Sequence, residues 1–103
     1  MDRNVYCAYN KAMDITYDPA KNERNMHERG LSFDRAADFD FHTAIYRIDD
    51  RQDYGETRFR AMGYLEGRLH ALVFVEHPTG IRVISFRKAN SREIKQYEST
   101  KQS

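Results

Sequence analysis

The chain has 103 residues, a single cysteine, no tryptophan and no long apolar run. One thiol, Cys7, can form neither an intramolecular disulfide nor a cysteine-based zinc site, so the composition fits a reducing compartment. No stretch approaches the roughly 20 apolar residues of a membrane-spanning helix, and the first residues lack the apolar segment of a secretory signal. We therefore expect a cytoplasmic protein that does not bind a membrane.

Several motifs that carry chemistry are also missing. The sequence has no glycine-rich phosphate loop, no serine elbow and no Cys-His pair, which argues against nucleotide hydrolysis and acyl transfer. In an extended segment Asp38, Asp40 and His42 would share a face and could bind a metal, whereas on a helix Asp38 and His42 would form an ordinary i,i+4 contact. We favour the second interpretation and expect neither a metal nor a cofactor.

Apolar residues are sufficient for one compact core. They make up 40% of the chain and include seven tyrosines and six phenylalanines, enough to offset the entropy of ordering one domain but not two. Charges are unevenly distributed: residues 34–56 carry seven acids and three bases, whereas residues 82–103 carry six bases and two acids. Either a basic face binds phosphates while the acidic segment holds a basic partner or the rest of the fold, or both faces are simply solvated.

Two short helices are predicted before residue 42. Asp18 as a cap and Pro19 in the first turn begin the first helix, and Gly30 can adopt the left-handed conformation that ends it. Ser32 then caps a second helix, because apolar residues recur near helical spacing at Phe33, Ala36, Ala37 and Phe41. A tight Gly-Leu-Ser corner joins the two helices.

After Phe41 the apolar periodicity changes from helical to alternating, which predicts β-strands. We expect four, over residues 43–48, 57–65, 69–75 and 81–86, with turns at residues 66–67 and 78–80. Asn90 and Glu93 match a capping box that opens a last helix, on which Ile94 and Tyr97 share a face directed at the core. The predicted fold class is α+β: two N-terminal helices, an antiparallel meander of about four strands and a C-terminal helix.

Five motifs follow one another along the chain: DITYDPAKN from residue 14, GLSFDRAADF from 30, RFRAMGY from 58, GRLHALVFV from 67 and RVISFRKA from 82, before the EIKQY segment at 93. In this order and spacing they resemble the BrnT family of bacterial toxins, over residues 13–97. We therefore predict a single domain at residues 13–103. Residues 1–12 form an N-terminal extension; either Met13 is the natural start or the extension is a flexible arm.

The resemblance implies a RelE-like fold and a metal-independent endoribonuclease. Such a protein is the toxin of a type II toxin-antitoxin system, and it inhibits translation by cleaving RNA. The resemblance also implies a ribbon-helix-helix antitoxin, BrnA-like, that silences the toxin. Because that antitoxin binds operator DNA, we expect contact with DNA only through the complex of the two proteins.

Metal-free RNA cleavage needs a base for the 2′-hydroxyl, cations for the phosphorane and an acid for the leaving 5′-oxygen. We predict Arg58, His77 and Arg87 as catalytic residues. Arg87 precedes a helix N-terminus, which favours phosphate, and the pKa of an ordinary histidine suits proton transfer near neutrality. The predicted substrate-binding residues are Arg29, Arg82 and Lys88. In a regular strand Arg82 and Arg87 leave opposite faces, so a shared cleft requires a bend.

Two positions depart from the family pattern. Where family members usually carry Lys-His before the corner glycine, this chain has Glu28-Arg29, and where they often carry Thr-x-Arg after the apolar strand it has Val75-Glu76-His77. Arg29 can bind phosphate but is a poor general base. His27 lies about 200° away on the helix and does not substitute for the missing histidine. The alternative to the enzyme is a catalytically weakened or inactive module that binds RNA or a partner protein without cleaving.

Overall fold

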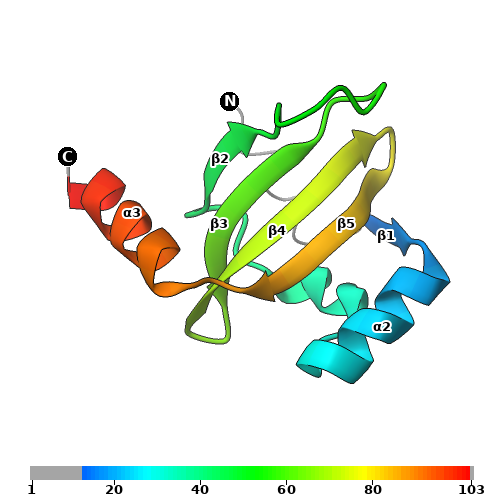
Figure 1. Cartoon of the computed structure of the whole chain (residues 1–103), viewed down its shortest axis with the longest axis horizontal. Helices are drawn as coiled ribbons and strands as arrows, with labels where there is room; N and C mark the ends of the chain where they lie inside the picture. Colours follow the sequence, from blue (N-terminus) through cyan, green and yellow to red (C-terminus); the bar gives the residue numbers. More distant parts are fainter. Residues whose placement is uncertain (1–12, 103) are drawn as a thin grey trace.

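A computed structural model describes residues 13–102 and shows an α+β fold, as predicted (Figure 1). The predicted N-terminal extension, residues 1–12, lies outside the described residues. Within residues 13–102, no helix combines the length and apolar character needed to cross a bilayer. The elements are β1 (Asp14–Tyr17), α2 (Pro19–Arg29), a 3-10 helix η1 (Phe33–Asp38), β2 (Ile45–Ile48), β3 (Phe59–Leu65), β4 (Arg68–His77), β5 (Gly80–Lys88) and α3 (Ser91–Gln102).

The sheet has five strands in the order β1-β5-β4-β3-β2. Strands β2 to β5 form the predicted antiparallel meander. The fifth strand, β1, pairs in parallel with β5, with Ile15 opposite Ile81, so the sheet is mixed and the prediction of a purely antiparallel sheet was incomplete. A four-residue segment has too few positions to show a periodicity, and its partner lies far along the chain.

Helix α2 begins and ends as the sequence predicted. The Asp18 carboxylate accepts a hydrogen bond from the Ala20 amide at 2.9 Å, and Gly30 is left-handed with φ 65°. The contacts of α2 with the rest of the fold include two buried asparagines. Asn22 accepts a bond from the Phe33 amide at 2.7 Å, and Asn25 donates to the carbonyls of Leu31 and Phe86, each at 2.9 Å.

The predicted second helix, Ser32 to Phe41, is a 3-10 helix of six residues, so this prediction was wrong in type and length. Ser32 is the cap, as expected, and accepts a bond from the Asp34 amide at 3.1 Å. The physical reason is the spacing of the buried side chains. Phe33, Ala36 and Phe39 recur every three residues, which matches the 3.0-residue turn of a 3-10 helix.

Both faces of the sheet carry an apolar cluster. The larger one joins β3, β4 and β5 to η1 and the segment after it, and its most buried large side chains include Phe39, Phe41 and Phe74. The smaller cluster lies under α3 on the opposite face, where Leu69, Ala89 and Tyr97 pack together. Tyr97 is 6% exposed and donates to the Thr43 carbonyl at 3.0 Å, so its predicted place in the core is confirmed.

Strand β5 contains the bend that is needed for Arg82 and Arg87 to lie on one face of the sheet. The register shifts at Val73 and Phe74 of β4, so that Val73 faces Ser85 while Phe74 faces Val83, and Ile84 is the extra residue of a β-bulge. Arg82 therefore pairs with Val75 and Arg87 with Ala71. Since alternate residues of β4 share a face, both arginines lie on the same face of the sheet, unlike in a regular strand.

Candidate active site

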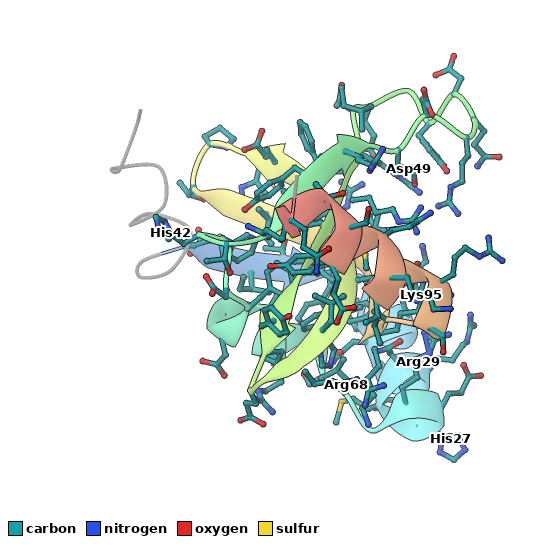
Figure 2. All side chains as sticks on the ribbon, turned by 90° about the vertical axis from the view of Figure 1, so that its left-hand side faces the viewer. His27, Arg29, His42, Asp49, Arg68 and Lys95 are labelled. Atoms are coloured by element: carbon teal, nitrogen blue, oxygen red, sulfur yellow. The ribbon has the colours of Figure 1, made fainter. Side chains whose placement is uncertain are left out.

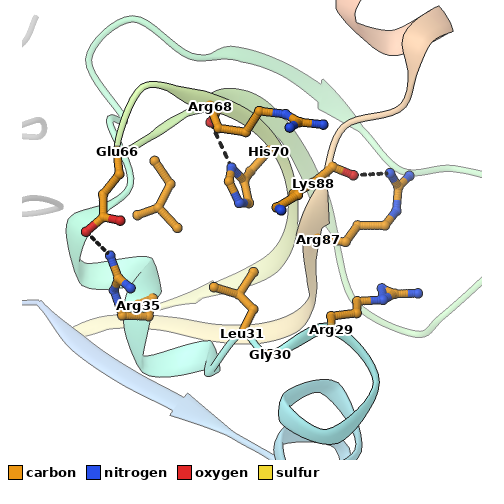
Figure 3. A pocket seen from close by; sticks show the side chains of 10 residues that line it. Arg29, Gly30, Leu31, Arg35, Glu66, Arg68, His70, Arg87 and Lys88 are labelled. Carbon is orange, nitrogen blue, oxygen red and sulfur yellow. Dashed lines mark hydrogen bonds and ion pairs between the residues drawn. The ribbon is translucent and has the colours of Figure 1, made fainter.

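A cavity of about 590 Å³ opens where the β3–β4 turn, the end of β5 and the end of α2 meet (Figure 3). Side chains that can carry a positive charge dominate its lining, and one glutamate accompanies them. Figure 2 shows Arg29 and Arg68 near one another, away from His42 and Asp49. The lining residues are Arg29, Gly30, Leu31, Arg35, Leu65, Glu66, Arg68, His70, Arg87 and Lys88.

Local sequence explains how the cavity is formed. The left-handed Gly30 ends α2, and its amide donates to the Met26 carbonyl at 2.8 Å, which leaves Arg29 at the rim. On the other side, Glu66 and Gly67 both have positive φ, 49° and 78°, and make the two-residue turn that brings Arg68 back along β4. The tight corner and the tight turn thus place two arginines at one opening.

The cations of the cavity differ in how they are neutralised. Arg35 is paired with Asp38 at 3.1 Å and with Glu66 at 2.7 Å. Among the described side chains, Arg29, Arg68 and Lys88 have no ion-pair partner. These three charges remain available to an anion such as a phosphate.

His70 lies in the middle of the cavity lining and is 4% exposed. Its Nδ1 lies 2.8 Å from the Arg68 carbonyl, which can only accept a hydrogen bond, so Nδ1 carries the proton and Nε2 carries the lone pair. Burial lowers the pKa of His70 below its ordinary value, although the bond to the Arg68 carbonyl opposes this. The neutral imidazole is therefore favoured near pH 7, in the form that can accept a proton.

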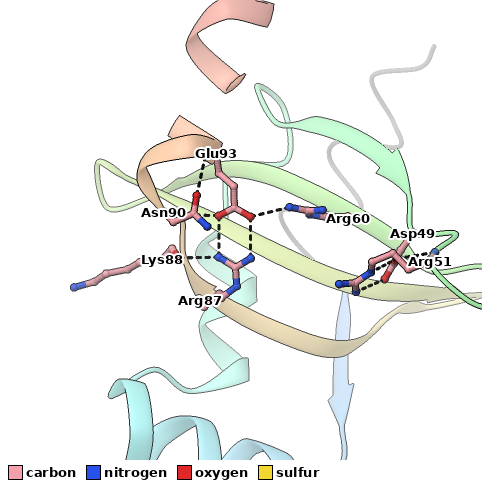
Figure 4. Close-up of polar contacts among 7 residues, drawn as sticks. All are labelled: Asp49, Arg51, Arg60, Arg87, Lys88, Asn90 and Glu93. Carbon is pink, nitrogen blue, oxygen red and sulfur yellow. Dashed lines mark hydrogen bonds and ion pairs between the residues drawn. The ribbon is translucent and has the colours of Figure 1, made fainter. Parts of the chain in front are cut away.

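Arg87 lies on the opposite face of the sheet from His70, where Glu93 binds it (Figure 4). The two side chains form two parallel hydrogen bonds of 2.8 Å, and Arg60 adds a third at 2.7 Å. Glu93 also accepts from the Asn90 amide at 2.9 Å, and Asn90 accepts from the Glu93 amide, which confirms the predicted capping box. The carboxylate of Glu93 therefore occupies the N-terminus of α3, where we had expected a phosphate.

Arg58 and Arg82 form a second group with one acid between them. Glu56 lies 2.6 Å from Arg82 and 3.5 Å from Arg58, and the Arg58 guanidinium stacks 3.9 Å from the centre of the Tyr54 ring. Arg82 and Arg87 face residues of β4 that are four positions apart, about 14 Å along the strand. The structure thus places Arg58 and Arg82 on the same sheet face as Arg87, but outside the cavity.

His77, the third predicted catalytic residue, lies at the opposite end of β4 from His70. Its Nε2 is buried and has no hydrogen-bond partner. Of the six predicted site residues, the cavity brings together three, which are Arg29, Arg87 and Lys88. Sequence reasoning missed His70 and Arg68. A signal for His70 was present, because in HALVFV it alternates with Leu72 and Phe74 and so is a polar residue on the core face.

The residues considered for a metal site serve the local fold. Asp38 pairs with Arg35, and Asp40 accepts bonds from the amides of His42 and Thr43 and from the Thr43 hydroxyl at 2.7 Å. These bonds lower the pKa of Asp40, the Thr43 hydroxyl being the largest cause. In the part of the chain that the structure describes, no group of three or more histidine, cysteine or acidic side chains is arranged to hold a metal ion.

A family model described as "Ribonuclease toxin, BrnT, of type II toxin-antitoxin system" matches residues 17–93, which is most of the chain. No curated protein matched. The matched range contains the complete cavity lining and all six residues predicted from the sequence. The chain belongs to the BrnT family of ribonuclease toxins of type II toxin-antitoxin systems.

Proposed function

We propose that this protein is an active, metal-independent endoribonuclease whose reaction takes place in the cavity around His70. The observation that carries this proposal is the combination in one cavity of a neutral imidazole and three cations that no described acid neutralises. A base and a cluster of positive charge are the two requirements of metal-free RNA cleavage. Family membership supports the choice of RNA as the substrate.

In the proposed reaction Nε2 of His70 takes the proton of a ribose 2′-hydroxyl. The 2′-oxygen then attacks the adjacent phosphorus, the bond from phosphorus to the 5′-oxygen breaks, and the products are a 2′,3′-cyclic phosphate and a 5′-hydroxyl. Arg29, Arg68 and Lys88 stabilise the charge that builds up on the phosphorane oxygens. The departing 5′-oxygen takes a proton from Lys88 or from water.

Arg87 supports this chemistry from the cavity wall. Its guanidinium is bonded to Glu93 and to the Lys88 carbonyl at 3.2 Å, so it fixes the end of β5 and the position of Lys88. Direct catalytic roles for Arg58 and His77 remain predictions from the sequence, and the two residues lie outside the cavity.

The second candidate function is a module that binds RNA or a partner without cleaving it. Two observations favour it: Glu28 and Arg29 replace the usual Lys-His pair of the family, and Glu93 neutralises Arg87. In this case the cavity would hold a phosphate while His70 only bonds to the Arg68 carbonyl at the start of its own strand, β4.

Digestion of RNA by the purified protein, with and without EDTA, separates the two functions. We expect cleavage to persist in EDTA and to fall by about 10- to 100-fold in Arg29→Ala, which removes one phosphate contact. Arg47→Ala removes an exposed cation from β2, at the other edge of the sheet from α2, and should retain the wild-type rate. Tight RNA binding without cleavage supports the module, and cleavage abolished by EDTA contradicts metal independence.

We further propose that a BrnA-like ribbon-helix-helix antitoxin silences the toxin in the cytoplasm, that the complex meets DNA through the antitoxin, and that RNA cleavage inhibits translation. Membership of a type II toxin-antitoxin family supports a protein antitoxin, and the mixed sheet with its helices is compatible with a RelE-like fold. A reading frame for a small ribbon-helix-helix protein beside the gene would support this partner, and its absence would argue against it.

A further inference from the structure

A second, smaller cavity of about 250 Å³ lies next to the first one along α2. The two cavities share Arg29. The second one lies between α2 and the bulge of β5, where Ile84 and Ser85 line it. We call the two neighbouring cavities together the α2–β5 groove, with the His70 cavity at one end.

The edge of β5 forms the floor of this groove because β1 is too short to cover it. β1 pairs with β5 from Gly80 to Val83, and residues 84–88 have no further strand beside them on that edge within the described part of the chain. Asn25 reaches across from α2 and donates to the Phe86 carbonyl at 2.9 Å, which fixes the distance between the two walls. The groove is therefore built by the fold and does not depend on a mobile loop.

Positive charge continues along the α2 wall. Lys21, Arg24 and Arg29 line the second cavity together with one acid, Glu28, and Lys21 and Arg24 are exposed. Among described residues neither Lys21 nor Arg24 has an ion-pair partner. Arg24 and Arg29 are five residues apart, about 7.5 Å along the helix axis, so the cations of the α2 wall are spread along the helix.

We propose that the second cavity is a subsite for the nucleotide next to the scissile phosphate, with Lys21 and Arg24 holding its phosphate. The ligand is single-stranded RNA that lies in the α2–β5 groove and enters the His70 cavity through Arg29. This inference rests on the proposed function and adds a substrate requirement to it: the enzyme needs nucleotides beyond the cleaved step, on the side that reaches α2.

Single-stranded RNA fits the groove better than an acidic protein segment does. Lys21 and Arg24 line a cavity that shares Arg29 with the first one, so positive charge is present in both cavities, as a chain of phosphates requires. Ile84, which is half-buried, lines the second cavity and offers a small apolar surface for a base. An acidic peptide would be expected to pair its backbone with the β5 edge, but the Asn25 side chain already bonds to the Phe86 carbonyl there.

Binding of 2′-O-methyl oligonucleotides tests the subsite without cleavage. The probes are a dinucleotide and hexanucleotides extended from it in the 5′ or the 3′ direction, measured by fluorescence anisotropy. In the wild type, extension of the dinucleotide to a hexanucleotide in one of the two directions should raise the affinity. In Lys21→Ala/Arg24→Ala we expect this gain to be about 5- to 10-fold smaller. The slope of the logarithm of the binding constant against the logarithm of the salt concentration should also become about 0.7 less negative for each phosphate contact removed. The control Arg47→Ala/Lys101→Ala should retain the full gain.

The outcomes separate the subsite from the nuclease assignment. An equal gain in the Lys21/Arg24 variant and the wild type overturns the subsite, even if the protein cleaves RNA. If the gain in affinity depends on Lys21 and Arg24 but the protein does not cleave RNA, the subsite is supported. Only the nuclease proposal is then contradicted. If the variant loses affinity for poly-L-glutamate as strongly as for the hexanucleotide, the groove is a general site for acidic chains and the proposal is wrong.

Discussion

At the scale of single residues, Glu93 has more charged and polar partners than the other acids described. Glu93 is 4% exposed. Its carboxylate binds Arg60 and Arg87 and closes the capping box of α3. The hydrogen bonds from Arg87 are the largest cause that lowers the pKa of Glu93 from 4.5 to about 2. Glu93 therefore connects α3 to β3 and β5 through ion pairs as well as through its buried position.

This coupling predicts how stability depends on pH. Because the folded state depresses the pKa of Glu93, its contribution is complete above pH 4.5 and is lost as the pH falls from 4.5 towards 2. At pH 7 we expect Glu93→Gln to lower the free energy of unfolding by about 3 kcal/mol, measured by urea denaturation. The difference from wild type should vanish near pH 2.

Glu98→Gln is the matched control, since Glu98 is an exposed glutamate of the same helix. Its free energy of unfolding should stay within about 0.5 kcal/mol of wild type at all pH values. A destabilisation in Glu93→Gln that does not change between pH 7 and pH 2 would mean that lost packing, and not the ionised carboxylate, is responsible.

Residue patterns explain which parts of the site could be predicted. Arg29 precedes a glycine that must end a helix, and Lys88 ends a strand before a capping box, so both positions could be found from local rules. His70 could be found only by asking why a polar residue occupies the core face of β4. The contact of Glu93 with Arg60 could not be found, because Arg60 lies 33 residues away and meets it only after the sheet has formed.

At the scale of elements, α2 contributes no buried apolar side chain, and its buried residues are Asn22 and Asn25. Asn25 satisfies the carbonyls of Leu31 and Phe86, so it joins the Gly30 corner to β5 and holds Arg29 at the rim of the cavity. Buried carbonyls that lose their only donor are costly. The position of α2, and with it half of the α2–β5 groove, depends on these polar bonds.

We expect Asn25→Ala to lower the free energy of unfolding by about 2–3 kcal/mol in urea denaturation, because it leaves two carbonyls without this donor and removes packed atoms. It should also weaken RNA binding, since Arg29 loses its fixed position. The control Glu23→Ala changes an exposed residue of the same helix and should cost less than about 0.5 kcal/mol. Equal stability of the two variants would show that α2 is held by other contacts.

The elements also show the limits of local prediction. Caps, turns and alternating strands fixed the boundaries of most elements to within a few residues. The 3-10 helix was missed because two apolar spacings compete in this segment. Phe33, Ala36 and Phe39 fit a spacing of three, but Phe33, Ala36 and Phe41 fit the stripe of an α-helix almost as well. The bulge at Ile84 has no local marker, and it alone decides that Arg82 and Arg87 share a face.

At the scale of the whole molecule, net charge is a poor guide to the partner. The chain carries a net charge of +1, yet five of the nine described cations without an ion-pair partner line the α2–β5 groove. Many carboxylates of the acidic segment are bound locally, including Asp34, Asp38, Asp40, Asp49, Asp53 and Glu56. Arginines pair with Asp38, Asp49 and Glu56 of this segment, while the basic lining of the groove remains open to a polyanion.

The two histidines of β4 provide the most direct test of where RNA is cleaved. They lie at opposite ends of one strand, His70 in the cavity and His77 outside it. The measurement is the single-turnover rate of RNA cleavage in EDTA for His70→Asn and His77→Asn, with folding of each checked by thermal unfolding. We expect a loss of about 10²- to 10⁴-fold in His70→Asn, as for removal of a general base, and a rate within about twofold of wild type in His77→Asn. A folded His70→Asn that cleaves at the wild-type rate, or a loss confined to His77→Asn, would contradict the account.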